Sequence, residues 1–395
     1  MKILHTVEFY YPSVGGAQEV VRHLSERMVK KGHDVTVATT YLPDRVAAVH
    51  NGVKIVEFKV SGNSVNGIKG EKKKYQDFLK KNDFDVVMNY AAQQWTADAF
   101  FEVIDEVSAK KVFVPCGYSA LYDPNYAGYF KKLPDILRKY DATVYLANQY
   151  RDIDFARQHK LDDVVVIPNG ADETEFTTKL TEDEKRSIKN RYGIGGLMIM
   201  TTGNYTGEKG HRELINVFRK LPVTNATLVS AGTLKPHDGC FDWFNQETWG
   251  INQSRKLVSK RVVMIDGTDR PTVRDLMKAA DIFAFLSNIE CSPLVLFEAA
   301  AAGTPFVATA AGNSAEIAQW TGGGTIVKTH DQPNGRVIAD TKDALWKLSR
   351  LAHSPALRNK LGENGHKAWK QKYTWDTLTD QYLALYKKIT TRGTR

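Results

Sequence analysis

The chain has 395 residues and a formal net charge of +9, and this length is more than one hydrophobic core usually serves, so we expect two domains. Its composition, 42% apolar and 25% charged, is typical of a soluble globular protein and excludes a low-complexity or fibrous chain. No apolar run is long enough to span a bilayer, and the one after Lys2 is too short for a signal peptide. The three cysteines, Cys116, Cys240 and Cys291, are scattered without metal-ligand spacing, which indicates a reducing cytoplasm.

The basic charge suits anionic partners, and its densest patch is the segment "KGEKKKYQDFLKK" at 69–81. No DNA- or RNA-binding motif accompanies the patch, so we expect no nucleic-acid partner. Its apolar side is thin, and we interpret it as a solvated lysine face. The alternative is a weak, salt-sensitive peripheral association with the anionic inner face of a membrane through Lys72, Lys73 and Lys74.

Strand-like and helix-like segments alternate from the N-terminus. A first strand is followed by a loop with Gly15 and Gly16, and then by an amphipathic helix that ends at Gly32. Repeated βα units of this kind predict a parallel sheet with helices on both faces. The strands are expected at 2–7, 33–40, 84–90, 111–116, 142–147 and 164–169.

The same pattern then starts again, and its strands are expected at 197–203, 226–232, 261–267, 281–287 and 305–310. An irregular, tryptophan-bearing insertion is expected at 233–250. Turn and acidic residues near 167–176 place the boundary, so we predict domains 1–168 and 169–374. The amphipathic helix of the tail is expected to pack back, with 375–395, on the first domain.

Gly15 and Gly16 lie between a strand and a helix, where a loop without side chains exposes backbone N–H groups and a positive helix end. That arrangement suits a phosphate, although many such turns use glycine for geometry alone. The full G-x-G-x-x-G pattern is absent, which argues against a nicotinamide enzyme.

Lys209 comes just before the helix that follows the first strand of the second domain. A cation there does not favour the helix dipole, so it is either a counter-charge for a bound anion or a solvated surface lysine. Position alone leaves these two interpretations equal.

The segment "SNIECSPLVLFEAAAAGTP" at 287–305 contains two glutamates separated by a proline. Because Pro293 has no N–H, it suits the first turn of a helix, and no helix can continue across it from Glu290. Glu290 is therefore expected in a loop and Glu298 about five residues into a helix. The free N–H groups of Leu294 and Val295 are expected at the same crevice above the strand ends, where open α/β sheets bind ligands.

Glu298 has apolar neighbours on both sides, which predicts burial, and a buried carboxylate needs a partner. We favour a ligand, such as the cis-diol of a ribose, over an internal salt bridge.

At these residues the sequence resembles retaining glycosyltransferases of family GT4, which have the GT-B fold of two tandem Rossmann-like α/β domains facing a central cleft. Glu290 to Glu298, with Ser292 between them, matches the E-x7-E motif. The segments "GGAQE", "VIPNGAD" and "TGNYTGEKGH" are similar to further family motifs, in the family's order.

The resemblance implies a function, namely the transfer of a sugar from a UDP- or GDP-sugar to a lipid-linked glycan, a polysaccharide or a small molecule. It implies that Glu298 holds the ribose, that Glu290 and Lys209 act at the sugar and the leaving diphosphate, and that Gly15 and Gly16 approach the substrates. No metal and no cofactor is implied, because cationic side chains and helix ends replace Mg²⁺.

Two residues depart from the family pattern. Asn204, after Gly203, stands where the family usually has arginine, and Arg212 is a candidate to replace that charge. Cys116, before Gly117, stands where the family often has histidine near the sugar, and we interpret it as a buried, unreactive cysteine. These departures keep open the alternative of a non-catalytic nucleotide-sugar binding protein. A glycoside phosphorylase or synthase of the same fold is a further alternative.

Overall fold

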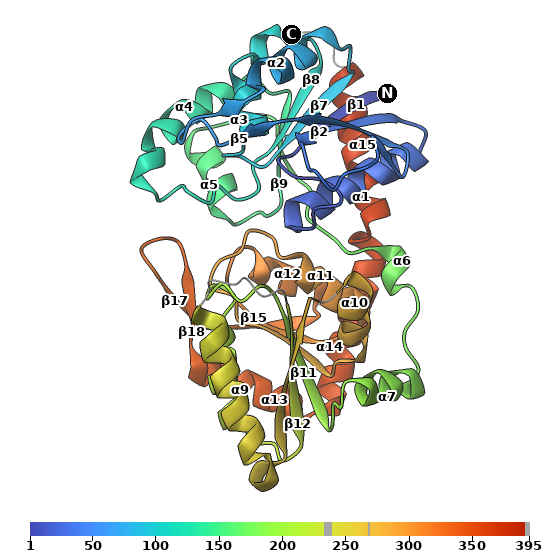
Figure 1. Ribbon diagram of the computed structural model, residues 1–395, viewed down its shortest axis with the longest axis vertical. Helices are drawn as coiled ribbons and strands as arrows, with labels where there is room; N and C mark the ends of the chain where they lie inside the picture. Colours follow the sequence, from blue (N-terminus) through green and yellow to red (C-terminus); the bar gives the residue numbers. More distant parts are fainter. Residues whose placement is uncertain (233–238, 268, 392–395) are drawn as a thin grey trace. The chain divides into compact units, whose positions relative to one another are not determined.

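The structure is a computed structural model, and it describes residues 1–232, 239–267 and 269–391. The chain divides into two compact units (Figure 1). The first is Met1–Asn169 with the C-terminal segment from Trp375, and the second is Gly170–Thr374.

The first unit is built on an eight-stranded sheet in the order β10-β9-β8-β7-β1-β2-β4-β3, which is parallel except for the β3–β4 pair at one edge. The strands are β1 (Lys2–Thr6), β2 (Asp34–Thr40), β3 (Val49–His50), β4 (Val53–Phe58), β7 (Val86–Tyr90), β8 (Lys110–Val114), β9 (Ala142–Tyr145) and β10 (Val164–Val166). The helices are α1 (Gly16–Lys30), α2 (Lys72–Lys81), α3 (Trp95–Phe101), α4 (Ala127–Leu137), α5 (Arg151–Gln158) and α15 (Trp375–Thr391), with a small hairpin of β5 (Val60–Ser61) and β6 (Lys69–Gly70).

Helix α15 packs against α1 in this unit, as Figure 1 shows. His5, on the first strand, contacts both helices: its Nδ1 lies 2.8 Å from Ser25 Oγ and its Nε2 lies 3.2 Å from Tyr386 Oη. At the surface, Lys31 Nζ lies 2.8 Å from Asp376 and 2.9 Å from Asp380. The C-terminal helix is thus held by both buried and exposed contacts.

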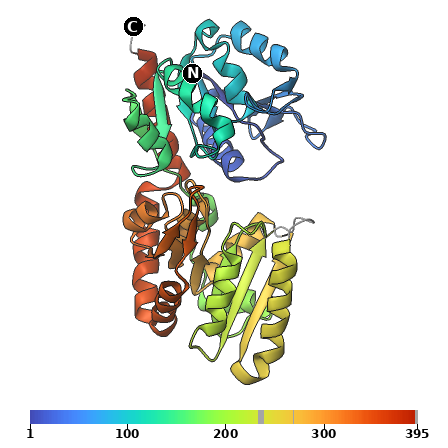
Figure 2. The ribbon, with the colours of Figure 1, turned by 90° about the vertical axis from the view of Figure 1, so that its left-hand side faces the viewer.

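The second unit has a six-stranded parallel sheet in the order β13-β12-β11-β14-β15-β16. The strands are β11 (Leu197–Thr202), β12 (Ala226–Gly232), β13 (Lys260–Asp266), β14 (Ile282–Phe285), β15 (Phe306–Thr309) and β16 (Gly324–Val327), and β17 (Thr329–Asp331) and β18 (Val337–Ala339) form a separate antiparallel hairpin. The helices are α6 (Glu173–Phe176), α7 (Glu182–Arg191), α8 (His211–Lys220), α9 (Gly239–Val258), α10 (Arg270–Ala279), α11 (Leu294–Ala302), α12 (Ser314–Thr321), α13 (Thr341–His353) and α14 (Pro355–Lys372). The second view shows α9 running alongside β13 (Figure 2).

Helix α11 lies in the core of the second unit and is buried along most of its length. Two glycines of α14 allow a close approach: a Cβ added at Gly362 would meet the Gly303 carbonyl oxygen at 2.1 Å, and one at Gly365 would meet Ala300 Cα at 3.2 Å. Because α11 is fixed so closely, the residues at its N-terminus are held in a defined place at the edge of the sheet.

The strands expected from the sequence are present, but other regions differ. The expected irregular insertion is wrong from Gly239 onward, where the chain forms the helix α9, while its first residues, 233–238, and the Cys240 side chain lie outside the described part. Strands β4 and β16, and the strands β3, β5, β6, β17 and β18 of only two or three residues each, were not predicted.

Candidate functional site

Two loops meet at the carboxyl edge of the second sheet, one after β11 and one after β14. The backbone N–H of Asn288 donates to the Glu208 carbonyl oxygen at 2.7 Å, and Ser287 Oγ lies 3.2 Å from the same oxygen. The strands β11 and β14 are neighbours in the sheet, so their following loops are brought side by side. This places the predicted residues Lys209 and Glu290 together.

Lys209 Nζ lies 2.7 Å from Glu290 Oε1, and Ser287 Oγ donates to the same carboxylate oxygen at 2.8 Å. Both charged side chains are partly exposed, at 28% for Lys209 and 14% for Glu290. The ion pair therefore lies at the carboxyl edge of the sheet and is accessible to solvent.

Two glycines set the path of the Lys209 loop. Gly203 has φ +146°, and an added Cβ would meet Lys209 Cγ at 3.1 Å. Gly210 has φ +67° and precedes the first residue of α8, and an added Cβ would meet the Leu286 carbonyl oxygen at 1.8 Å. Only glycine fits Gly210, because the backbones of the two loops approach closely there.

Pro293 separates the two glutamates as predicted, but it is the N-cap of α11 and not a residue of its first turn. Glu290 lies in the loop and Glu298 is the fifth residue of the helix, 6% exposed. The first helical residues are Leu294 and Val295, and no side chain caps their N–H groups. The N-terminus of α11 thus offers backbone donors beside Glu290.

Glu298 takes part in an internal ion pair, which is the alternative that the sequence left open. Arg270, on α10, contacts Glu298 Oε1 at 2.7 Å and Glu175 at 2.6 Å. Burial lowers the pKa of Arg270, but the two carboxylates more than offset it and raise that pKa overall. A carboxylate has about four lone-pair positions, so one ion pair does not exhaust the hydrogen-bonding capacity of Glu298.

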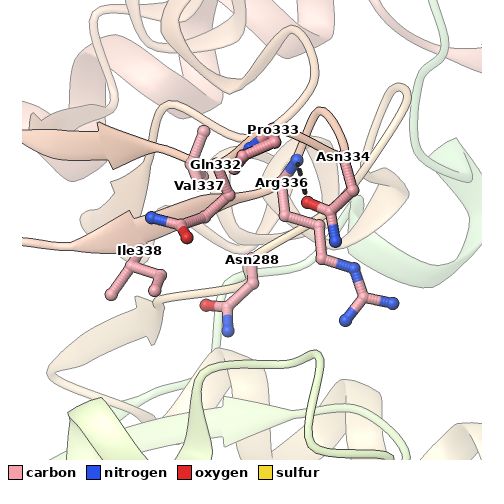
Figure 3. A pocket seen from close by; sticks show the side chains of 7 residues that line it. All are labelled: Asn288, Gln332, Pro333, Asn334, Arg336, Val337 and Ile338. Atoms are coloured by element: carbon pink, nitrogen blue, oxygen red, sulfur yellow. Dashed lines mark hydrogen bonds between the residues drawn. The ribbon is translucent and has the colours of Figure 1, made fainter. Parts of the chain in front are cut away.

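A pocket of about 410 Å³ lies beside the Lys209 loop, between Asn288 and the hairpin β17–β18 (Figure 3). Arg336, between the two hairpin strands, forms an ion pair with Glu208. No local sequence pattern predicts this contact, because 128 positions separate the two residues.

Arg212, the candidate to replace the charge absent at Asn204, has its guanidinium 5.3 Å from the centre of the Trp243 ring. Asn204 is exposed, and its carbonyl oxygen accepts a hydrogen bond from the Thr206 N–H.

His211 begins helix α8 and is 1% exposed, with its ring stacked on Tyr205 at 4.7 Å. Within the described residues, neither ring nitrogen has a hydrogen-bond partner. Burial, followed by the charge of Lys209, lowers the pKa of His211 to about 4, so the ring is neutral near pH 7.

Gly15 and Gly16 belong to the first unit and begin α1. Gly15 is the N-cap, with extended backbone, and a Cβ there would meet the Gln18 amide at 2.6 Å. A Cβ on Gly16 would meet nothing within 4 Å, so that position is open to solvent. The N-terminus of α1 is therefore uncovered at Gly16.

Cys116 and Gly117 follow β8. Cys116, Gly117 and Tyr118 have φ of +55°, +97° and +43°, a run of left-handed backbone that is rare outside functional loops. Cys116 is only half-buried, which corrects the expectation of a buried cysteine. The buried carboxylate of Asp152 accepts from the Gly117 N–H at 3.1 Å, and burial raises the pKa of Asp152 to about 6.

The described residues contain no group of three or more His, Cys, Asp or Glu side chains that could hold a metal ion. Asp85, in the "DFD" segment at 83–85, instead accepts a hydrogen bond from the Lys2 N–H at 2.7 Å. Among the described helices, none combines the length and apolar character needed to cross a membrane.

Comparison with protein families identifies both parts of the chain. Residues 184–368 match the family "Glycosyl transferases group 1", and residues 14–175 match "Glycosyltransferase Family 4". An uncharacterized glycosyltransferase of Methanocaldococcus jannaschii is 29% identical over 57% of this chain and 54% of its own length, so this match spans about half of that relative. N-acetyl-alpha-D-glucosaminyl L-malate synthase of Bacillus anthracis is 23% identical over 95% of this chain and 94% of its own.

Solved structures show the same fold. Sucrose-phosphate synthase from Thermosynechococcus elongatus has a TM-score of 0.78 at 17% identity, over 98% of both chains. The Anabaena protein HepE in complex with UDP-glucose has a TM-score of 0.74 at 14% identity, over 98% of this chain and 100% of its own. The chain therefore has the GT-B fold, and its two parts match the models of the family 4 and group 1 glycosyltransferases.

Proposed function

We propose that the protein transfers a sugar, with retention at the anomeric carbon, from a UDP- or GDP-sugar to an acceptor. The observation that carries the proposal is the Lys209–Glu290 pair at the carboxyl edge of the second sheet, beside the open N-terminus of α11. The Anabaena structure that contains UDP-glucose supports a nucleotide-sugar as the donor.

In the proposed donor complex, Lys209 neutralises charge that develops on the leaving diphosphate, and the N–H groups of Leu294 and Val295 donate to its oxygens. Glu290 then accepts hydroxyl groups of the transferred sugar, and Glu298 accepts those of the ribose. Such donors act on charge as it forms, so their contribution is larger in the transition state than in the bound donor.

The sugar is proposed to leave and to be attacked on the same face. The acceptor hydroxyl gives its proton to the departing phosphate as the new glycosidic bond forms, so no protein nucleophile is needed. We propose that the reaction requires no metal, since Lys209 and the helix N-terminus supply the positive potential.

Donor binding must rearrange existing ion pairs. Glu290 already neutralises Lys209, and Glu298 is already paired with Arg270. A diphosphate competes with Glu290 for Lys209. Salt screens the attraction between the diphosphate and the lysine. Donor affinity is therefore expected to fall as ionic strength rises.

The test is nucleotide release from a panel of UDP- and GDP-sugars by purified protein, with thermal stabilisation by UDP and GDP measured on the same samples. Turnover that is lost in Lys209→Met supports the transferase. Tight nucleotide binding without turnover for any acceptor indicates a binding protein, and phosphate-dependent release of a sugar phosphate indicates a phosphorylase.

We further propose a cytoplasmic protein with weak attachment to anionic membranes through Lys72, Lys73 and Lys74. The structure gives each of these lysines an acidic partner, respectively Glu102, Asp77 and Glu71, which reduces the net charge of the face. Co-sedimentation with vesicles containing phosphatidylserine tests the idea, and it fails if neutralising all three lysines leaves binding unchanged.

A further inference from the structure

The pocket of Figure 3 lies outside the groups assigned to the donor, and its chemistry indicates a ligand of its own. One wall is Asn288, two residues before Glu290. The other is the hairpin β17–β18 with the turn between its strands. At about 410 Å³, the pocket is within the range of small-molecule sites, roughly 300–1,000 Å³.

The hairpin wall is anchored to the donor edge. The Val337 N–H donates to the Asn288 carbonyl oxygen at 2.8 Å, and Asn288 in turn donates to the Glu208 carbonyl oxygen at 2.7 Å. Arg336 adds its ion pair with the Glu208 side chain. The hairpin, the β14 loop and the Lys209 loop are thus joined in series, and the pocket keeps a fixed place relative to Lys209.

The polar groups of the pocket provide both donors and acceptors. Asn288 Oδ1 is buried without a hydrogen-bond partner among the described residues, so turning this amide into the pocket breaks no bond of that oxygen. Arg336 has five N–H donors, and within the described contacts its guanidinium uses only Nη2, on Glu208. Figure 3 shows Asn288 and the Arg336 guanidinium on the same side of the hairpin.

The rest of the lining consists of the polar residues Gln332 and Asn334 and the apolar residues Pro333, Val337 and Ile338. The described residues that line the pocket include no aromatic ring, so a nucleobase would find no surface to stack on. A free phosphate would have to compete with Glu208, which already pairs with Arg336. Hydroxyl groups, which donate and accept, match this set, and the carbons of a sugar ring match the aliphatic surface.

We propose that this pocket is a carbohydrate subsite that binds one pyranose unit of the acceptor, separate from the sugar that is transferred. The inference rests on the proposed glycosyl transfer and adds that the acceptor is itself a glycan or glycoside. Asn288 and Arg336 hydrogen-bond the hydroxyl groups of that unit, and the hairpin covers its ring.

The experiment is a titration of UDP-saturated full-length protein with methyl glycosides of glucose, galactose, mannose and N-acetylglucosamine, followed by ligand-observed NMR, with inorganic phosphate as a separate probe. At least one glycoside is expected to bind. Asn288→Ala and Arg336→Leu are each expected to weaken it about fivefold, the effect of one lost hydrogen bond of about 1 kcal/mol. UDP affinity is expected to change less than twofold.

Arg350→Leu is the matched control, since Arg350 lies 4.8 Å above the Trp346 ring on α13, outside the pocket. The proposal is overturned if no glycoside binds the wild type, if Arg350→Leu weakens binding as much as Arg336→Leu, or if phosphate binds at Arg336 in place of glycosides. Failure of UDP to stabilise the protein counts against the proposed function instead. The glycoside titration without nucleotide then still shows whether the pocket binds a carbohydrate.

Discussion

Lys209 Nζ lies 2.7 Å from Glu290 Oε1, although the two residues are 81 positions apart in the chain. Each charge compensates the other in the absence of a substrate. Removing the Lys209 charge is therefore expected to weaken nucleotide binding, whereas removing the Glu290 charge is expected to preserve or strengthen it. Both changes are expected to reduce transfer.

Lys209→Met is expected to reduce both UDP affinity and transfer, the latter by about 10²–10³-fold if Lys209 stabilises the leaving group as preorganised donors do. Steady-state kinetics and UDP titration measure the two effects. Lys220→Met, at an exposed position on α8, is the control and should match the wild type. Equal turnover in the two variants would show that Lys209 has no part in the reaction.

Glu290→Gln removes the carboxylate that competes with the diphosphate for Lys209. UDP is expected to bind as tightly as to the wild type or more tightly, most clearly at low salt, while transfer falls because the sugar loses an acceptor. Titration at two salt concentrations, with turnover on the same protein, measures both. Weaker UDP binding in this variant would contradict the proposed competition.

The local features of this site were predictable because they depend on residues close in sequence. Pro293 alone separated Glu290 from Glu298, and the glycine-bounded turn before α8 pointed to Lys209. The partners of these side chains were not predictable. Arg270 reaches Glu298 from another helix, and no local pattern encodes a contact that depends on how two helices pack.

In the fold as well, features with a clear local pattern were predictable and the others were not. The βα alternation predicted both parallel sheets, since buried parallel strands appear as apolar runs. Segment 233–250 was predicted to be irregular because its tryptophans and polar residues show little helical amphipathicity, yet α9 begins within it at Gly239. The hairpin β17–β18 was missed because its strands have only three residues each, too few for a period.

Arg270→Leu leaves Glu175 and Glu298 side by side without their shared cation. The variant is expected to lose about 1–3 kcal/mol of unfolding free energy, less than a fully buried pair would, because the guanidinium is partly exposed. Thermal unfolding measures the loss. The control is Arg274→Leu on the same helix, where the arginine pairs with its neighbour Asp275 at the surface, and a loss as large there would assign the effect to α10 in general.

Gly210→Ala and Gly207→Ala separate backbone strain from steric clash. Both glycines have left-handed φ, +67° and +76°, so backbone strain alone should cost each variant about 1 kcal/mol. Only Gly210 faces another backbone, the Leu286 carbonyl, so its variant should lose more stability than Gly207→Ala, displace the Lys209 loop and weaken UDP binding. Equal stability and equal UDP affinity in the two variants would contradict the close approach.

His211 makes the second unit sensitive to acid. Its folded pKa of about 4 lies below the value of 6.5 expected when it is unfolded, so between these pH values the unfolded chain binds a proton that the folded chain does not. The stability that neutral His211 provides is complete above pH 6.5 and is lost as the pH falls towards 4, by up to about 3 kcal/mol.

His211→Phe keeps an aromatic ring against Tyr205 but has no titrating group, so its melting temperature should fall less than that of the wild type between pH 7 and pH 4.5. His5 lies in the other unit, and burial lowers its pKa to about 3, so part of the acid sensitivity should persist in the variant. His330→Gln, at an exposed position, is the control, and an acid response in His211→Phe identical to that of the wild type would exclude His211 as its source.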